Sequence, residues 1–296
     1  MNTIIELRNI SHSFVAWQNV LNNVSLQIPK GSIYGLLGRN GAGKTTCIRL
    51  LVGLLKPQEG SVKLLQEDPL LWNSSVSQRL GYMGESGFLP ENMTGKRLIS
   101  WTKKLYPQWD EELEKRLVEM FQLNLLCRIS SLSLGQQRQL AFVLAVAFRP
   151  AVLILDEPAA NLDVVARRQF LEEIAALARE SETTVLFSSH ILSDVERVAD
   201  RVGILSNGSL LLDEPLDDLK AGIRQVRFFW DRPGPPPVQI PAAYRYRDGH
   251  GETLVTLRFS DAETMQKIAA AAGCSWEACG LNLEDLFVEI TGEKQL

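Results

Sequence analysis

A glycine-rich loop that leads into a lysine and two threonines has the residue types needed to bind the phosphates of a nucleotide. Its residues are Gly38, Arg39, Asn40, Gly41, Ala42, Gly43, Lys44, Thr45 and Thr46. Glycines let the backbone curl, so that successive N–H groups point at phosphate oxygens. The lysine of such a loop reaches the β- and γ-phosphates, and the next hydroxyl can bind Mg²⁺. The spacing therefore predicts a nucleotide-binding site with Lys44 and Thr45 at its centre.

Two adjacent carboxylates follow a strongly apolar run later in the chain. Asp156 and Glu157 come directly after residues 151–155, AVLIL. Such a strand is typical of the middle of a parallel sheet, and ligands bind at the carboxyl ends of these strands. Asp156 is suited to hold Mg²⁺, and Glu157 to accept a proton from an attacking water or to orient it. The alternative is an ordinary strand end with a solvated acidic turn, which the phosphate loop makes the weaker interpretation.

A histidine stands at the end of another apolar run. His190 follows residues 184–189, TVLFSS, which read as a further strand. A histidine just past a strand end can contact a γ-phosphate that is bound there. The alternative is a histidine that caps the next helix. The phosphate loop and the two carboxylates favour the functional interpretation.

The segment 131–140, SLSLGQQRQL, is a polar start for a helix whose continuation, residues 141–148, is apolar. A helix that begins near Gly135 would offer free N–H groups and the positive end of its dipole to an anion. Ser133 would add a hydroxyl donor. The alternative for Ser133 is simple capping of the helix N-terminus, and one hydroxyl could serve both purposes at different times.

The elements that would position these residues alternate between strand and helix. Apolar runs at 4–7, 24–28 and 32–37 indicate strands, and a helix is expected from Lys44 to Val52. Residues 96–148 have a helical pattern, which includes a helix over 109–122. From 151 to about 220, strand and helix signals alternate again. This pattern predicts an α/β fold in which helices flank a parallel sheet.

The composition changes after residue 220. Residues 231–241 are proline-rich and cannot continue a helix or a central strand. Beyond them, a strand is expected over 253–259, and helices over 262–272 and 283–290. We therefore predict one large domain over 1–220, with a helical subdomain at about 96–148, and a small α+β appendage over 221–296.

Composition and charge exclude several classes of protein. The net charge of −4 gives no basic footprint over the whole chain, so nucleic acid is not expected as a partner. Four cysteines without a CxxC pair fit a reduced compartment better than a disulfide scaffold or a zinc site. Neither a signal peptide nor a membrane-spanning run is expected, because no apolar run approaches ~20 residues.

These motifs together resemble an ATP-binding-cassette (ABC) ATPase, specifically the nucleotide-binding subunit of an ABC transporter. The similarity covers about residues 4–220 and implies the P-loop fold of an ABC cassette, with a mixed central sheet, flanking helices and a helical subdomain. Leu132–Gln136 resembles the LSGGQ signature just ahead of the Walker B strand, and Asn161–Asp163 resembles the D-loop. His190 matches the switch histidine. Phe14 matches the aromatic residue that stacks on adenine, with Trp17 as an alternative and plain packing as the other explanation for either ring.

The resemblance implies ATP and Mg²⁺ as ligands and a head-to-tail dimer, with a second copy or a related cassette. In that arrangement each signature covers the γ-phosphate that the other subunit holds. Ser133, Gly135 and Gln136 would then contact the partner's nucleotide, and Asp163 would lie beside it. Leu134 stands where the signature usually has a glycine, which puts close backbone approach there in question.

A second departure lies in residues 81–85, which align with the Q-loop of the family. Glu85 stands where glutamine is usual. Either side chain offers an oxygen to Mg²⁺ or to water. Glu85 is therefore a candidate metal ligand, together with Thr45 and Asp156. It is also a candidate catalytic residue, together with Glu157 and His190. Its extra negative charge predicts a change in metal dependence or turnover.

The segment 104–123 and the ending LEDLFVEITGE resemble bacterial exporters of the antibiotic-, peptide- and lipid-handling type. Such ATPases work at the cytoplasmic face of the membrane with a separately encoded permease. One alternative is a soluble ABC ATPase that acts on nucleic acid or the ribosome, although those relatives usually carry two cassettes or a long coiled coil. A P-loop kinase is a third hypothesis, but it would need neither signature nor D-loop. No residue pattern identifies the cargo or the role of 221–296.

Overall fold

A computed structural model describes residues 2–15, 18–71, 74–85, 89–230, 243, 245–248, 252–259 and 262–292. The chain forms two compact units, Met1–Asp213 and Glu214–Leu296. Helix α8 (Leu216–Gly222) contacts strand β10 (Ile223–Phe229) within the second unit. The predicted domain limits at 220 and 221 stay a prediction.

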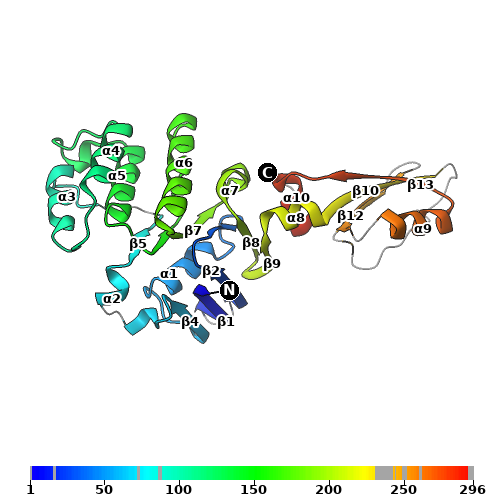
Figure 1. Cartoon of the computed structure of the whole chain (residues 1–296). Coiled ribbons are helices and arrows are strands. Elements are labelled where there is room, and N and C mark those ends of the chain that lie inside the picture. Colours follow the sequence, from blue (N-terminus) through cyan, green and yellow to red (C-terminus); the bar gives the residue numbers. More distant parts are fainter. Residues whose placement is uncertain are drawn as a thin grey trace. The chain divides into compact units, whose positions relative to one another are not determined.

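A six-stranded sheet forms the centre of the first unit (Figure 1). Its strands, in spatial order, are β5 (Leu80–Met83), β6 (Val152–Leu155), β7 (Thr184–Ser189), β3 (Ile33–Leu37), β8 (Arg201–Ser206) and β9 (Ser209–Pro215). Each pair from β5 to β8 is parallel. Every residue of β3, β6 and β7 is buried, as expected for strands with both faces covered. The predicted parallel sheet is confirmed, and the carboxyl ends of its central strands meet at one edge.

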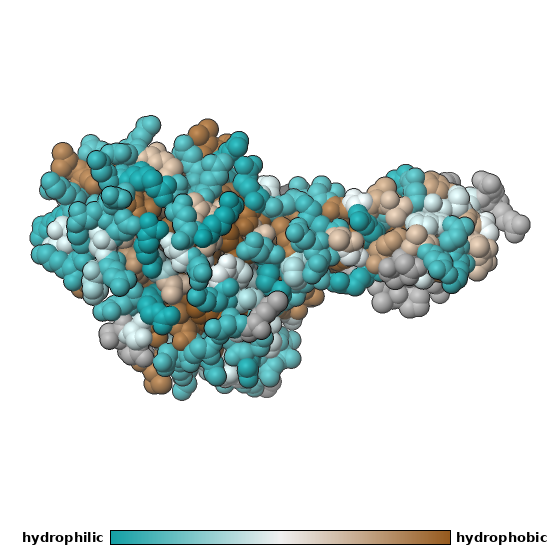
Figure 2. Space-filling view, in the orientation of Figure 1, coloured by the Kyte–Doolittle hydropathy of each residue, from teal (hydrophilic) through white to brown (hydrophobic). Residues whose placement is uncertain are grey.

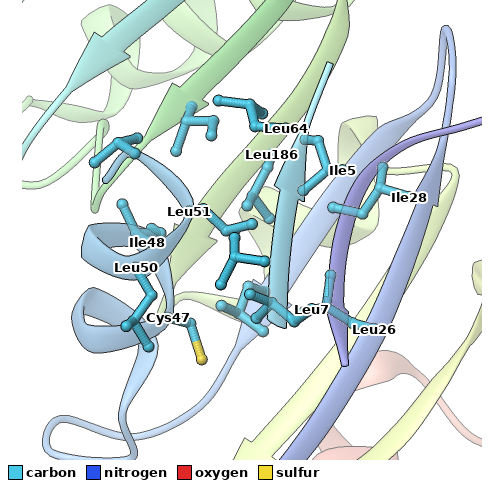
Figure 3. Packing of buried hydrophobic residues seen from close by; sticks show 14 of the residues in the cluster. Ile5, Leu7, Leu26, Ile28, Cys47, Ile48, Leu50, Leu51, Leu64 and Leu186 are labelled. Atoms are coloured by element: carbon cyan, nitrogen blue, oxygen red, sulfur yellow. The ribbon is translucent and has the colours of Figure 1, made fainter. Parts of the chain in front are cut away.

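A three-stranded antiparallel sheet completes the core of this unit. Its order is β2 (Gln18–Pro29), β1 (Thr3–Val15) and β4 (Glu59–Leu64). Helix α1 (Lys44–Leu51) begins and ends within one residue of the prediction. Figure 3 shows Ile48, Leu50 and Leu51 of α1 facing side chains of this sheet and Leu186 of β7. Burial of this apolar face fixes α1, and with it the loop that precedes it.

Helices gather in the segment between β5 and β6 and beyond it. They are α3 (Gly95–Lys103), α4 (Glu111–Met120), the short η2 (Ile129–Ser131), α5 (Leu134–Val146), α6 (Val164–Ser181) and α7 (Leu192–Val198). The short elements η1 (Pro69–Leu71) and α2 (Ser74–Ser77) precede β5. Helix α4 is shorter than the predicted 109–122 because Asp110 caps it and Gln122 has a positive φ of 51°. The rings of Phe142 and Phe170 lie 4.2 Å apart and join α5 to α6.

The second unit is a four-stranded antiparallel sheet with helices, as predicted for an α+β appendage. Its strand order is β11 (Arg245–Asp248), β12 (Glu252–Arg258), β10 and β13 (Ser275–Gly280), and its helices are α8, α9 (Ala262–Ala272) and α10 (Leu283–Thr291). Phe228, Val255 and Met265 lie in its core. The proline-rich segment 231–241 lies outside the described residues.

Two further expectations concern cysteines and the membrane. All four cysteines are free thiols, and Cys47 is buried in the core of the first unit. Burial raises the pKa of the Cys47 thiol to about 12. Within the described ranges, no helix has the length and apolar character needed to cross a bilayer.

Candidate functional site

The phosphate loop runs from the end of β3 into α1 with the backbone geometry that its glycines allow. Gly41 and Gly43 have positive φ angles of 81° and 107°, which disfavour other residues. A Cβ atom on Gly43 would also lie 2.6 Å from a methyl group of Leu21. The loop therefore needs glycine at position 43 for conformation and for space. Of the other predicted loop residues, Asn40 is exposed, and Ala42 and Thr46 are buried.

Lys44 begins α1 and its side chain turns back over the loop. It is 6% exposed, and its Nζ donates to the carbonyl oxygen of Gly38 at 2.7 Å. The same Nζ lies 3.1 Å from Oε1 of Glu157. The ammonium is thus held at the centre of the site, between the phosphate loop and the end of β6.

The two carboxylates after β6 are positioned by Ser188 on the neighbouring strand β7. The Ser188 hydroxyl donates to Oδ1 of Asp156 at 2.6 Å and accepts the backbone N–H of Glu157 at 2.8 Å. Asp156 is completely buried, and this burial raises the pKa of its carboxyl. The hydroxyls of Ser188 and, more weakly, Thr45 oppose the shift. Sequence reasoning passed over Ser188, because its contacts depend on the pairing of β6 with β7.

Glu157 is held on both carboxylate oxygens. Its Oε2 lies 2.8 Å from Nδ1 of His190, and its Oε1 faces Lys44. Glu157 is 8% exposed, whereas nearly half of the His190 side chain is exposed. The ends of β3, β6 and β7 thus bring together three residues that lie far apart in the sequence.

Glu85 follows β5 at the same edge of the sheet and is exposed. Its Oε2 is 3.5 Å from Oγ1 of Thr45, the limit of a hydrogen bond. Its backbone carbonyl accepts a hydrogen bond from Arg138 of α5, which also donates to the carbonyl of Glu157. Sequence reasoning missed Arg138. The one feature of the sequence that could have pointed to Arg138 is its charge, because it lies just before the apolar part of the same helix.

The signature segment caps its own helix. Ser133 is the N-cap of α5, and Ser133 and Gln136 form a reciprocal capping box. A Cβ atom on Gly135 would lie 3.2 Å from the carbonyl oxygen of Asn161, so the signature packs against the D-loop segment. Leu134, which replaces the usual glycine, is 65% exposed and therefore does not obstruct the fold.

The last two predicted residues lie on exposed surface. Asp163 is the N-cap of α6, and its Oδ1 accepts the N–H groups of Val165 and Ala166, both at 2.9 Å. Phe14 is 57% exposed, and its ring meets that of His12 edge to face at 5.0 Å. Its exposure fits a stacking surface better than core packing. Trp17, the alternative to Phe14, lies outside the described residues.

Comparison with known proteins agrees with this site. The ABC transporter family matches residues 21–160. The chain is 31% identical to the ABC transporter ATP-binding protein YtrB of Bacillus subtilis, over 99% of both chains. It is 33% identical to the bacitracin transport ATP-binding protein BcrA of Bacillus licheniformis, over 77% of this chain and 75% of that protein.

The fold has solved counterparts as well. A dimeric ATP-binding cassette in a post-hydrolysis state, bound to ADP and Pi, matches with a TM-score of 0.64 and 21% identity, over 72% of this chain and 98% of that chain. That likeness concerns the fold alone. The site joins a phosphate loop to two carboxylates at the end of a strand, and the match to YtrB extends along the whole chain. The chain therefore belongs to the ABC transporter family and is one of its ATP-binding ATPase subunits.

Proposed function

We propose that this ATPase drives an exporter: it works as a head-to-tail dimer on the cytoplasmic face of the membrane and is coupled to a separately encoded permease. The observation that carries the hydrolytic part is the contact of Glu157 with both Lys44 and His190. A carboxylate held in this way is suited to orient an attacking water and to accept its proton. Lys44 and the N–H groups of the loop would bind the phosphates.

The donor set fits a magnesium ion. Oδ2 of Asp156 is completely buried and makes no regular hydrogen bond within the described part of the chain. A buried carboxylate oxygen of this kind is suited to a cation, because leaving it without a partner is costly. Asp156 would hold Mg²⁺ together with the Thr45 hydroxyl and Glu85. Bound Mg²⁺ would offset the charge that develops on the phosphates.

The surface around the signature supports a dimer. Leu134, Val164 and Val165 are large apolar residues that are more than half exposed, at the starts of α5 and α6. Figure 2 shows apolar patches of this kind between hydrophilic areas of the first unit. Such patches mark protein contacts. A second copy that covers them would bring the capped N-terminus of α5, with Ser133 and Gln136, towards a γ-phosphate on the partner.

A groove beside the helical segment supports a membrane partner. It has a volume of about 470 Å³ and is lined by α1, β5, α3, α5 and the residues next to them, among them Leu54, Leu89 and Leu144. The stacked rings of Tyr106 and Phe148, 3.8 Å apart, form part of its wall. We assign this groove to a short helix of the permease, because its lining is largely apolar. Gly84, next to Glu85, also lines it and would connect a docked helix to the site.

Export is the direction that the resemblance of residues 104–123 and of the ending LEDLFVEITGE to bacterial exporters favours. A relative named for bacitracin transport agrees with the antibiotic-handling type, although its name gives no direction. The alternative, a soluble ABC ATPase that acts on nucleic acid or the ribosome, has less support. The net charge is −4, which gives no basic surface over the whole chain for nucleic acid. The bacitracin relative does not fix the cargo of this chain.

The test is to purify the Glu157→Gln variant from its own host's membranes with ATP and Mg²⁺, and to identify the proteins that come with it. We expect a stoichiometric multi-helix membrane protein. Recovery from the soluble fraction with RNA or ribosomes would favour the alternative. Adding Leu54→Glu in the groove should abolish recovery of the membrane protein, whereas Leu126→Glu, at a leucine outside the groove that is also more than half exposed, should not.

A further inference from the structure

Arg138 joins three segments of the first unit that are far apart in the sequence. It lies in the second turn of α5, the helix that begins with the signature, and it is 9% exposed. Its Nη1 donates to the carbonyl oxygen of Glu157 at 2.7 Å, and its Nη2 donates to the carbonyl oxygen of Glu85 at 2.5 Å. One guanidinium therefore connects α5 with Glu85, two residues beyond β5, and with Glu157, two residues beyond β6.

The Arg138 guanidinium donates to backbone carbonyl oxygens and not to the carboxylates of Glu85 and Glu157. Burial lowers the pKa of Arg138, and the charges of Glu85, Glu157 and Asp156 oppose this shift. The hydrogen bonds nevertheless run to carbonyl oxygens, and the carboxylate of Glu157 keeps its contacts with Lys44 and His190. A planar fork with two donors suits this task, because it fixes the direction as well as the distance of each acceptor.

The backbone of Glu157 needs such support. Its φ is +49°, in the left-handed region that residues with a side chain seldom adopt. A conformation of this kind persists where the surroundings determine it. The Ser188 hydroxyl holds the N–H of Glu157, while Arg138 and the N–H of Ala160 hold its carbonyl.

We propose that Arg138 is a positioning residue for hydrolysis, which clamps the backbones of Glu157 and Glu85 to the signature helix. The clamp would make α5 and the hydrolytic carboxylate move together, so that a signature engaged on the partner's nucleotide is linked to the placement of Glu157 in its own subunit. The inference rests on the proposed role of Glu157. It adds a residue that touches neither phosphate nor water.

The test compares Arg138→Met, which removes the donors, with Arg149→Met just beyond the same helix. The guanidinium of Arg149 also donates to two groups, the Asp110 carboxylate and the Ser181 hydroxyl, both away from the phosphate loop and the signature. We expect Arg138→Met to lower kcat at least tenfold and to change KM for ATP less than twofold. Hydrogen exchange of the protein without nucleotide should rise at 84–85 and 156–160. Arg149→Met should leave both readouts unchanged.

Arg138→Lys separates a clamp from a simple charge effect. A lysine keeps the charge but cannot direct a rigid fork at both carbonyls, so its kcat should stay within threefold of the methionine variant. Wild-type kcat in the lysine or the methionine variant, or unchanged exchange at 84–85 and 156–160, would overturn the proposal. If the methionine variant does not fold, Arg138→Gln takes its place with the same two readouts. Absent ATP hydrolysis by the wild-type protein would contradict the proposed function instead, and the exchange measurement would still decide the clamp.

Discussion

Lys44 and Glu157 form a buried ion pair at the carboxyl end of the parallel sheet, with Nζ 3.1 Å from Oε1. Each charge compensates the burial of the other, and removing one partner of such a pair leaves the other uncompensated. The phosphates of ATP would compete with Glu157 for the same ammonium. Binding of ATP would therefore shift the Lys44 ammonium towards the nucleotide, and Glu157 would keep its contact with His190.

The first prediction concerns Glu157→Gln. We expect phosphate release to fall at least about a hundredfold, because the amide cannot accept the proton. ATP should bind as tightly as before or more tightly, since Lys44 loses a charged competitor. Phosphate release and equilibrium binding of a fluorescent ATP analogue measure the two effects. Glu182→Gln is the matched control, because Glu182 pairs with Lys30 at 3.0 Å but is exposed. Wild-type hydrolysis by Glu157→Gln would contradict the assignment.

The second prediction concerns Glu85→Gln. The amide keeps an oxygen for Mg²⁺ or water, and the backbone carbonyl that Arg138 binds is unaffected. We expect on the order of a tenth of wild-type turnover or more at saturating Mg²⁺. The Mg²⁺ concentration for half-maximal activity should rise, because one negative charge is lost. A titration of ATPase activity with Mg²⁺ measures both. Complete loss of activity in a folded variant would refute the near-equivalence of the two side chains.

The third prediction separates the two functions assigned to Ser133. Ser133→Ala should lower the free energy of unfolding by about 1 kcal/mol through loss of the N-cap. Ser133→Asp should keep that stability, because aspartate caps helices equally well, yet its charge would repel the partner's γ-phosphate. Denaturant unfolding measures the first effect. ATP-dependent dimerisation, measured by size-exclusion chromatography in the Glu157→Gln background, measures the second. Normal dimerisation of the aspartate variant would place the signature away from the phosphate.

The fourth prediction concerns pH and Asp110, the N-cap of α4. The N–H of Leu113 lowers the pKa of Asp110 below its ordinary 3.8, and Arg149, 2.7 Å away, contributes. A lowered pKa stabilises the fold above the ordinary value, and this stability is lost as the pH falls through the folded-state pKa. Asp110→Asn, which can still cap the helix, should cost less than ~1 kcal/mol at pH 7. Denaturant unfolding between pH 7 and pH 3 should show this difference shrinking below pH 4. A difference that does not depend on pH would exclude the ionic contribution.

The sequence by itself determined the features that depend on local chemistry. The helix α1 follows from its apolar spacing, and the phosphate loop follows from glycines that reach positive φ at Gly41 and Gly43. The buried strand before Asp156 and Glu157 follows from its continuous apolar run. Local patterns also gave α9 and α10 of the second unit. These predictions succeed because backbone geometry and burial periodicity act over a few residues.

Tertiary structure decided which of these residues meet. The order of the strands sets β7 between β6 and β3, and this order places Ser188 under both carboxylates and His190 against Glu157. The two residues that Arg138 contacts, Glu157 and Glu85, lie 19 and 53 residues away along the chain, and no sequence spacing predicts these contacts. Pairing of strands and packing of helices are settled by the burial of the whole core, so the clamp on Glu157 exists only once the chain has folded.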